Sequence, residues 1–132
     1  MRHAWIICAA MLASLSFTLT AAAAEITNEP LAKVKENIDD EKAILVDVRE
    51  KKEWDSGHIE GAIFLPLSGL QDGVSKGELK PLPKDKILYT HCVIGKRAVT
   101  AGNILQRYGY QVRVLKPGYK EMISAGFPKA KE

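Results

Sequence analysis

The chain contains four mostly apolar runs of four residues, separated by segments in which apolar residues recur every three or four positions. Each run ends at polar or turn-forming residues, which is typical of a short strand buried on both faces. The runs are residues 43–46, 62–65, 87–90 and 112–115. This pattern predicts four buried strands.

The segments between the runs predict helices. The apolar spacing that follows Asn28-Glu29-Pro30 predicts a first helix, which this tripeptide is expected to cap. Further helices are predicted from Ala98 to Tyr108 and from Tyr119 to Ala125. Short buried strands that alternate with helices indicate an α/β domain with a mostly parallel sheet and helices on both faces. Such sheets bind ligands beyond the carboxyl ends of their strands.

The first 24 residues have the three-part pattern of a secretory signal. Arg2 and His3 form a basic start, an apolar run extends from Ala4 to Leu19, and small residues end the segment at Ala24. We therefore expect residues 1–24 to be a cleaved signal peptide. Residues 25–132 would form one domain that is periplasmic or secreted, without stable membrane association. An uncleaved N-terminal anchor is the alternative, although the run is short for a membrane span.

Charge and cysteine content narrow the functions open to residues 25–132. This part of the chain has eighteen Lys and Arg against sixteen Asp and Glu, a formal charge of +2. A nucleic-acid-binding domain needs a clustered basic face, so we expect no nucleic-acid partner. Because Cys8 lies in the predicted signal, Cys92 has no partner for an internal disulfide. Cys92 is therefore either buried and inert or kept free for chemistry.

Cys92 lies just after a predicted strand and just before a predicted helix. A cysteine attacks as the thiolate, which a helix N-terminus or a fixed cation favours. The loop at residues 93–97 supplies both if its N–H groups turn inward over the sulfur and form an anion-binding nest. Gly95 permits the required turn, Arg97 is expected to brace the loop, and Lys96 adds positive charge at its mouth.

Several motifs, taken in order, resemble those of the single-domain rhodaneses. They are Asp47-Val48-Arg49, Glu53-Trp54, Gly57-His58-Ile59-Glu60-Gly61-Ala62, the loop from Cys92 to Arg97, and the segment from Leu115 to Pro128. The resemblance covers essentially all of residues 25–132 and is strongest to the small periplasmic sulfurtransferases. It implies a rhodanese-like α/β fold with a five-stranded, mostly parallel sheet. It also implies an active-site cysteine that carries sulfur as a persulfide.

The resemblance assigns roles by position. Cys92 matches the catalytic nucleophile that forms the persulfide. The loop around it matches the substrate-binding residues, which here are Val93, Ile94, Gly95, Lys96 and Arg97. Asp47 and Arg49 match structural supports at the end of a strand. His58 falls in a Gly-His-Ile turn and is also expected to be a structural support, with a role as general base as the alternative.

Two segments depart from the family pattern. Active relatives often have an arginine and a hydroxyl residue where this chain has Val93 and Ile94, so an anionic donor would find fewer side-chain partners here. The usual Gly-Gly-x-x-x-Trp of the closing segment reads Pro117-Gly118-Tyr119-Lys120-Glu121-Met122, which we interpret as a packing variation.

The resemblance implies an enzyme, a sulfurtransferase of the thiosulfate sulfurtransferase type. It would move a sulfane sulfur from a small donor such as thiosulfate to a thiol or cyanide acceptor. A protein acceptor, or a reductant for Cys92, is a further expected partner. A cysteine phosphatase on the same fold is one alternative, although its loop from cysteine to arginine is one residue longer. A sulfur-binding or redox-sensing module with little turnover is the other. We expect no cofactor and no metal, because His58, His91 and Cys92 lack the spacing of a zinc site.

Overall fold

The computed structural model describes residues 23–73, 79 and 82–132. Except for Ala23 and Ala24, the expected signal peptide lies outside these residues. Within the described part of the chain, no helix is long and apolar enough to cross a membrane. The elements follow in the order α1 (Leu31–Asp39), β1 (Ala43–Asp47), α2 (Lys51–Asp55), β2 (Ile63–Phe64), α3 (Leu67–Gln71), β3 (Ile87–His91), α5 (Lys96–Arg107), β4 (Gln111–Val114) and α6 (Tyr119–Ser124).

The described strands form one parallel sheet in the order β2-β1-β3-β4. All four strands predicted from the apolar runs are confirmed, and each observed strand begins and ends within one residue of its run. The expected fifth strand is reduced to a single parallel bridge between Ile26 and Val114, at the outer edge of β4. The chain enters α1 at Leu31, only five residues later, which leaves little length for a longer ladder.

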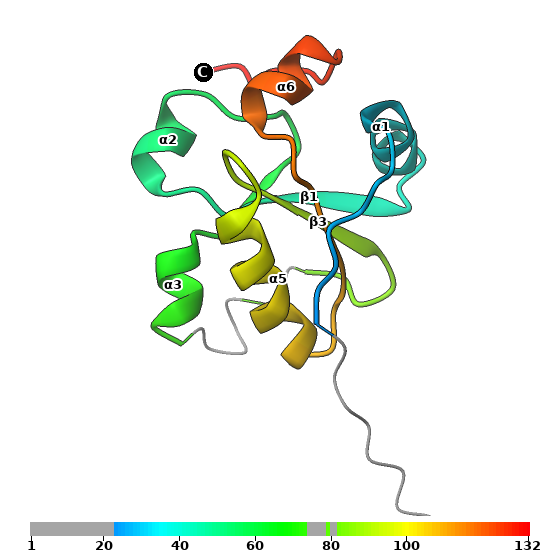
Figure 1. Ribbon diagram of the computed structural model, residues 1–132. Coiled ribbons are helices and arrows are strands. Elements are labelled where there is room, and N and C mark those ends of the chain that lie inside the picture. The colour runs from blue at the N-terminus through cyan, green and yellow to red at the C-terminus, as the bar shows by residue number, and fades with distance from the viewer. Residues whose placement is uncertain (1–22, 74–78, 80–81) are drawn as a thin grey trace, which may run out of the picture.

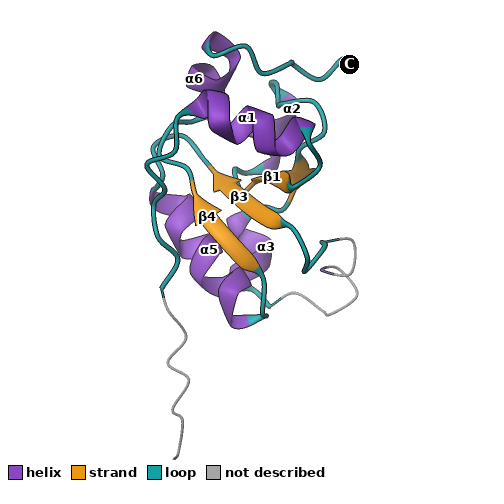
Figure 2. Ribbon diagram, turned by 90° about the vertical axis from the view of Figure 1, so that its right-hand side faces the viewer, coloured by secondary structure: helices purple, strands orange, loops and turns teal. Residues whose placement is uncertain are grey.

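Helices cover both faces of the sheet, as the alternating pattern predicted. Figures 1 and 2 show α3 and α5 on one face and α1 and α6 on the other. Neighbouring side chains of each strand separate into the two cores. Val46 and Leu88 pack with the residues of α5, whereas Leu45 and Tyr89 pack with those of α1 and α6. The sheet is therefore buried on both faces. Ligands can reach it at the carboxyl ends of its parallel strands.

The tripeptide before α1 ends at the N-cap residue of the helix, as predicted, but none of its side chains caps the helix. The N-cap residue is Pro30, and no side chain forms a cap hydrogen bond. The Glu29 carboxylate instead accepts hydrogen bonds from Arg113 at 2.7 Å and from the Tyr89 hydroxyl at 3.0 Å. These two partners lie on β4 and β3, so the segment fastens α1 to the sheet.

Ala24 already belongs to the packed domain. It is 7% exposed, and its N–H donates to Asn103 Oδ1 on α5 at 2.8 Å. A Cβ atom placed on Gly102 would lie 3.0 Å from the Ala24 methyl group, so helix and N-terminal segment are in close contact. Among the described residues, the packed part of the chain thus includes Ala24, the residue before the expected boundary at Glu25.

Candidate active site

Cys92 lies at the edge of the sheet where the parallel strands end. It directly follows β3, and its thiol is buried, with 1% of the residue exposed. Two contacts hold this position. Val48, at the end of β1, donates its N–H to the carbonyl of His91, and the Thr90 hydroxyl donates to the carbonyl of Ala98 in α5. The sulfur is therefore placed by the strand before it and by the helix after it.

The turn from Cys92 into α5 depends on Gly95. Its φ of +94° lies in the left-handed region, which favours glycine. In this conformation the Gly95 N–H donates to Cys92 Sγ at 3.2 Å. The sequence pattern predicted a nest of several N–H groups, but this is the one backbone donor to the sulfur among the described residues. The rest of the positive field at the sulfur must come from side chains.

Arg97 is held by a carboxylate from a distant part of the sequence. Its Nη1 and Nη2 donate to the two oxygens of Glu53, on α2, at 2.7 and 2.8 Å. The hydrogen bonds with Arg97 lower the pKa of Glu53 to about 2, although partial burial opposes the shift. The pKa of Arg97 is raised, chiefly by Glu53 and to a smaller extent by the Cys92 sulfur. Arg97 is therefore a permanent cation of the cysteine loop, and two hydrogen bonds to one carboxylate fix the direction of its guanidinium.

Glu53 itself is fixed at the start of its helix. One of its carboxylate oxygens also accepts the N–H of Glu50, the N-cap residue of α2, at 2.9 Å. The Glu50 carboxylate in turn accepts the Ser68 hydroxyl at 2.7 Å. This chain of contacts ties α2, α3 and the cysteine loop together.

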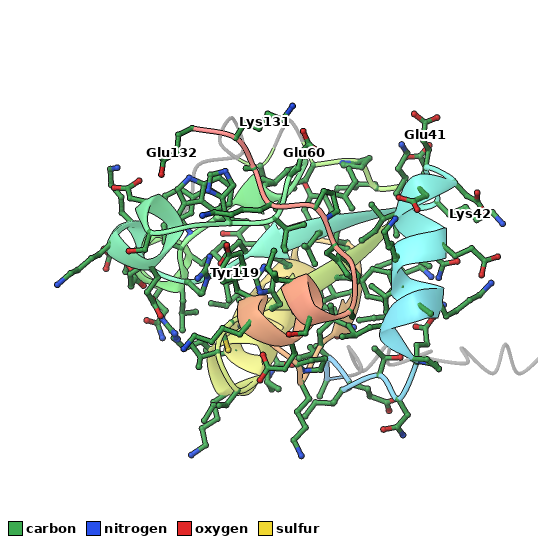
Figure 3. All side chains as sticks on the ribbon, turned by 90° about the horizontal axis from the view of Figure 1, so that it is seen from above. Glu41, Lys42, Glu60, Tyr119, Lys131 and Glu132 are labelled. Carbon is green, nitrogen blue, oxygen red and sulfur yellow. The ribbon has the colours of Figure 1, made fainter. Side chains whose placement is uncertain are left out.

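Asp47 and Arg49 form a buried ion pair at the end of β1. Arg49 donates to both carboxylate oxygens at 2.7–3.1 Å, and also to the carbonyl of Gly57 at 2.8 Å. Its guanidinium lies 5.0 Å from the ring centre of Tyr119, which Figure 3 labels on α6. The pair thus joins the strand end to the Gly57 turn and to α6. The side chains of the pair do not contact the sulfur; their assignment as structural supports stays a prediction.

His58 packs on the turn and has no described contact with Cys92. Its ring stacks on Trp54 with centroids 3.5 Å apart, and its Nδ1 lies 3.1 Å from the Trp54 carbonyl oxygen. A general base must reach the proton that it removes. The geometry favours the supporting role over the general-base alternative.

His91 is a buried histidine next to the nucleophile that sequence reasoning left without a role. It is fully buried, and neither ring nitrogen has a hydrogen-bond partner among the described residues. Nε2 lies 3.6 Å from Asp47 Oδ2. Burial lowers the pKa of His91 to about 4, although the Asp47 charge opposes the shift. The imidazole is therefore neutral at neutral pH and adds no cation to the site.

The outer surface of the loop is apolar. Val93 is 51% exposed and Ile94 is 62% exposed, so both side chains point away from the core. They line a groove of about 350 Å³ together with Lys116, Pro117 and Glu121. A larger hollow of about 710 Å³ lies between α3 and α5, but Cys92 does not line it. The smaller groove borders the cysteine loop through Val93 and Ile94, although Cys92 itself does not line it.

Gly118 allows the segment after β4 to pack directly on the cysteine loop. A Cβ atom at this position would lie 2.6 Å from the carbonyl oxygens of both Cys92 and Val93. Its φ of −104° is ordinary, so the contact and not the backbone conformation requires glycine. Gly95 is also close to the segment after β4, because a Cβ atom at this position would lie 3.3 Å from the Cα of Lys116.

Sequence reasoning missed three residues of this site: Glu53, Lys116 and Gly118. Glu53 and Gly118 fall within the motifs that carry the family resemblance, and that was the signal available for them. Lys116 also lies in the segment from Leu115 to Pro128, but only the packing of the chain after β4 shows that it reaches the loop.

Comparison with known proteins agrees with this geometry. The Rhodanese-like domain family matches residues 30–125. Protein YqhL of Bacillus subtilis, itself uncharacterized, is 38% identical over 81 residues, which span 61% of this chain and 60% of YqhL. The single-domain sulfurtransferase RDL2 of Saccharomyces cerevisiae has a similar structure, with a TM-score of 0.62 and 28% identity over 81% of this chain and 94% of RDL2. The human single-domain sulfurtransferase TSTD1 superposes equally well, with a TM-score of 0.62 and 25% identity over 78% of this chain and 96% of TSTD1. With most of its length matched, this chain belongs to the rhodanese-like domain family.

Proposed function

We propose that this protein is a sulfurtransferase that carries a sulfane sulfur as a persulfide on Cys92. The observation that carries the proposal is the position of the thiol. It is buried where β3 ends and accepts the Gly95 N–H, in the same loop as the Arg97 guanidinium that Glu53 holds in place and whose pKa is raised by Glu53 and by the sulfur. A sulfur anion is stabilised by such donors and cations, because they neutralise charge where water is excluded.

The first half of the reaction loads the sulfur. The Cys92 thiolate attacks the outer sulfur of a donor such as thiosulfate, and a new S–S bond forms. The old S–S bond of the donor breaks, and sulfite leaves with its electron pair. Cys92 then carries one extra sulfur, whose negative charge lies near Lys96 and Arg97. No metal or cofactor takes part in this scheme.

The second half unloads the sulfur. A thiolate or cyanide attacks the outer sulfur of the persulfide, and the bond to Cys92 breaks. Cys92 leaves as a thiolate, and the acceptor becomes a persulfide or thiocyanate. Each half exchanges one S–S or S–C bond for another, so atoms and charge balance without an external oxidant.

The test is a measurement of intact mass. The protein is incubated with thiosulfate, freed of excess reagent and weighed, then treated with cyanide and weighed again. We expect a gain of one sulfur atom that cyanide removes, and no gain in the Cys92→Ser variant. Sulfur loading that persists in Cys92→Ser would refute the proposal. Loading without repeated turnover would support the sulfur-binding or redox-sensing alternative, and rapid hydrolysis of a phosphate ester would support the phosphatase.

We also propose that the protein works in the periplasm or outside the cell. The support is the pattern of the first 24 residues, with a basic start, an apolar run and a small-residue end. Such compartments are oxidising, so the Cys92 thiol would need a sulfur donor that loads it or a reductant that keeps it reduced.

A further inference from the structure

Two apolar side chains next to Cys92 in the sequence are exposed to solvent. Val93 and Ile94 follow Cys92 directly, and each exposes more than half of its surface. Single exposed apolar residues are ordinary. Here, however, two adjacent ones form a wall of the groove whose other wall comes from Lys116 and Pro117.

Close packing holds the two walls of this groove together. Gly118 lies against the carbonyl groups of Cys92 and Val93, where even one added carbon would clash. Glu121 lines the groove, but its carboxylate accepts the Gly118 N–H at 3.1 Å and so faces the start of α6. The shape of the groove is therefore preformed, which lowers the entropy lost on binding.

Lys116 lines the groove, and Lys96 lies in the cysteine loop next to it, so positive charge lies on and beside the groove. Lys116 and Lys96 are exposed, and neither forms an ion pair with any residue in the described part of the chain. Such unpaired cations attract an acidic partner and orient it during encounter. Thiosulfate and cyanide have no apolar part that could cover Val93 and Ile94, so the apolar wall calls for a larger molecule.

We propose that the groove binds a peptide segment of a protein thiol acceptor, in which apolar residues flank the accepting cysteine and acidic residues lie next to them. This proposal rests on the proposed sulfurtransferase function and names its acceptor. The apolar residues would pack on Val93 and Ile94, and the acidic residues would lie near Lys116 and Lys96. Main-chain and side-chain contacts of this kind give a peptide both affinity and orientation.

The chemistry follows from where the outer sulfur stands. An S–S bond is about 2 Å long, so the outer sulfur of the persulfide would extend that far beyond the buried Cys92 sulfur. The thiolate of the bound peptide attacks this sulfur, the bond to Cys92 breaks, and the electron pair stays on Cys92. The peptide leaves as a persulfide, and no net oxidation occurs.

The experiment uses protein loaded with thiosulfate and freed of excess donor. It is mixed with one of three synthetic peptides, Glu-Leu-Cys-Leu-Glu, Glu-Ser-Cys-Ser-Glu or Lys-Leu-Cys-Leu-Lys. Intact mass against time gives the rate of transfer per loaded molecule. Each rate is divided by the rate of the same peptide with cystine, which removes differences in thiol reactivity. We expect the acidic apolar peptide to react about tenfold faster than the acidic polar one, and about threefold faster than the basic one.

Two variants and a control locate the preference. Ile94→Ser should remove most of the advantage of the apolar peptide, and Lys116→Glu should reverse the preference between acidic and basic peptides. Lys42→Glu makes the same charge change beside α1, away from α5 in Figure 3, and should leave the preference unchanged. If Ile94→Ser folds poorly, Lys116→Glu still decides, because Lys116 is an exposed residue outside the cysteine loop.

The outcomes separate this proposal from the proposed function. Equal rates for all three peptides, or an unchanged preference in Lys116→Glu, would overturn the peptide groove while leaving sulfur transfer intact. A faster reaction with a small hydrophilic thiol such as 2-mercaptoethanol than with any peptide would also overturn it. Failure to load sulfur on Cys92 would instead refute the proposed function, and that result is seen before any peptide is added.

Discussion

Arg97→Lys tests whether the cysteine loop is braced or merely charged. The substitution keeps the positive charge but replaces a planar fork with a single flexible ammonium. In the structure, the fork donates to both oxygens of Glu53, at 2.7 and 2.8 Å, and spans 44 residues of sequence. A lysine can keep one of these hydrogen bonds at most. We therefore expect the loop to lose definition although its charge is unchanged.

The magnitude follows from one lost charge-assisted hydrogen bond. Such bonds contribute about 1.5–3 kcal/mol when well buried. Both side chains of this pair are 33% exposed, so solvent screening reduces the contribution. We take about 1 kcal/mol, which corresponds to roughly a fivefold fall in kcat/KM for transfer from thiosulfate to cyanide.

The assay is steady-state sulfur transfer, with the loading step followed separately by mass. Arg113→Lys is a matched control, because Arg113 also donates to a carboxylate, that of Glu29, at 2.7 Å, but on β4 and without contact to Cys92. It should lower the melting temperature and leave turnover per folded molecule unchanged. Glu53→Gln completes a double-mutant cycle. If Arg97 acts through Glu53, Arg97→Lys should have little further effect in the Glu53→Gln background.

Two results would refute this reasoning. Unchanged kcat/KM in Arg97→Lys would mean that Arg97 acts only as a point charge, or has no part in the reaction. Fully additive losses in the double variant would mean that Arg97 and Glu53 act independently, in spite of their contact.

Four further predictions follow from the site and its surroundings. Gly118→Ala should push the loop from its position and lower kcat/KM by roughly tenfold or more. Gly69→Ala should not, because no atom lies closer than 3.8 Å to the new Cβ. Equal activity of the two variants in the same transfer assay would contradict the close contact. The pKa of His91 is lowered from 6.5 to about 4 in the folded protein, so between these pH values the unfolded chain binds a proton that the folded protein does not. The free energy of unfolding, measured by urea denaturation, should therefore fall as the pH falls through this window, by up to about 3 kcal/mol from this group, and His91→Leu should flatten the slope; an equal slope in that variant would show that other groups cause it. Val93→Arg should improve the use of thiosulfate roughly tenfold through KM, because a half-exposed position can present the new guanidinium to an anion; a lower melting temperature without a kinetic gain would contradict this. The exported protein should begin at or within a residue or two of Glu25, because small residues end the apolar segment at Ala24, and N-terminal sequencing that finds Met1 would contradict it.

The sequence by itself determined the strands, the order of the elements and the place of the nucleophile. Apolar runs of four residues that end at polar or turn-forming residues are typical of short buried strands, and all four appear within one residue of their predicted limits. Cys92 then had to lie at the ligand-binding edge, because it directly follows a parallel strand. The turn at Gly95 could also be predicted, since a left-handed residue before a helix favours glycine. Each of these conclusions depends on residues that are close together in the chain, and a local sequence pattern carries information about such residues.

Only the tertiary structure decided which distant groups complete the site. The partner of Arg97 is Glu53 because the fold brings α2 to the start of α5, and a pattern within either helix carries no trace of the other. Lys116 and Gly118 reach the loop because β4 lies beside β3 and the chain then turns back over Cys92. The side chains of Asn28-Glu29-Pro30 do not cap α1 for the same reason: Arg113 and Tyr89, far along the chain, hold the Glu29 carboxylate in place. The outward direction of Val93 and Ile94 was equally open until the packing of the loop was known. Sheet register and helix packing set these distances, and both are properties of the whole fold.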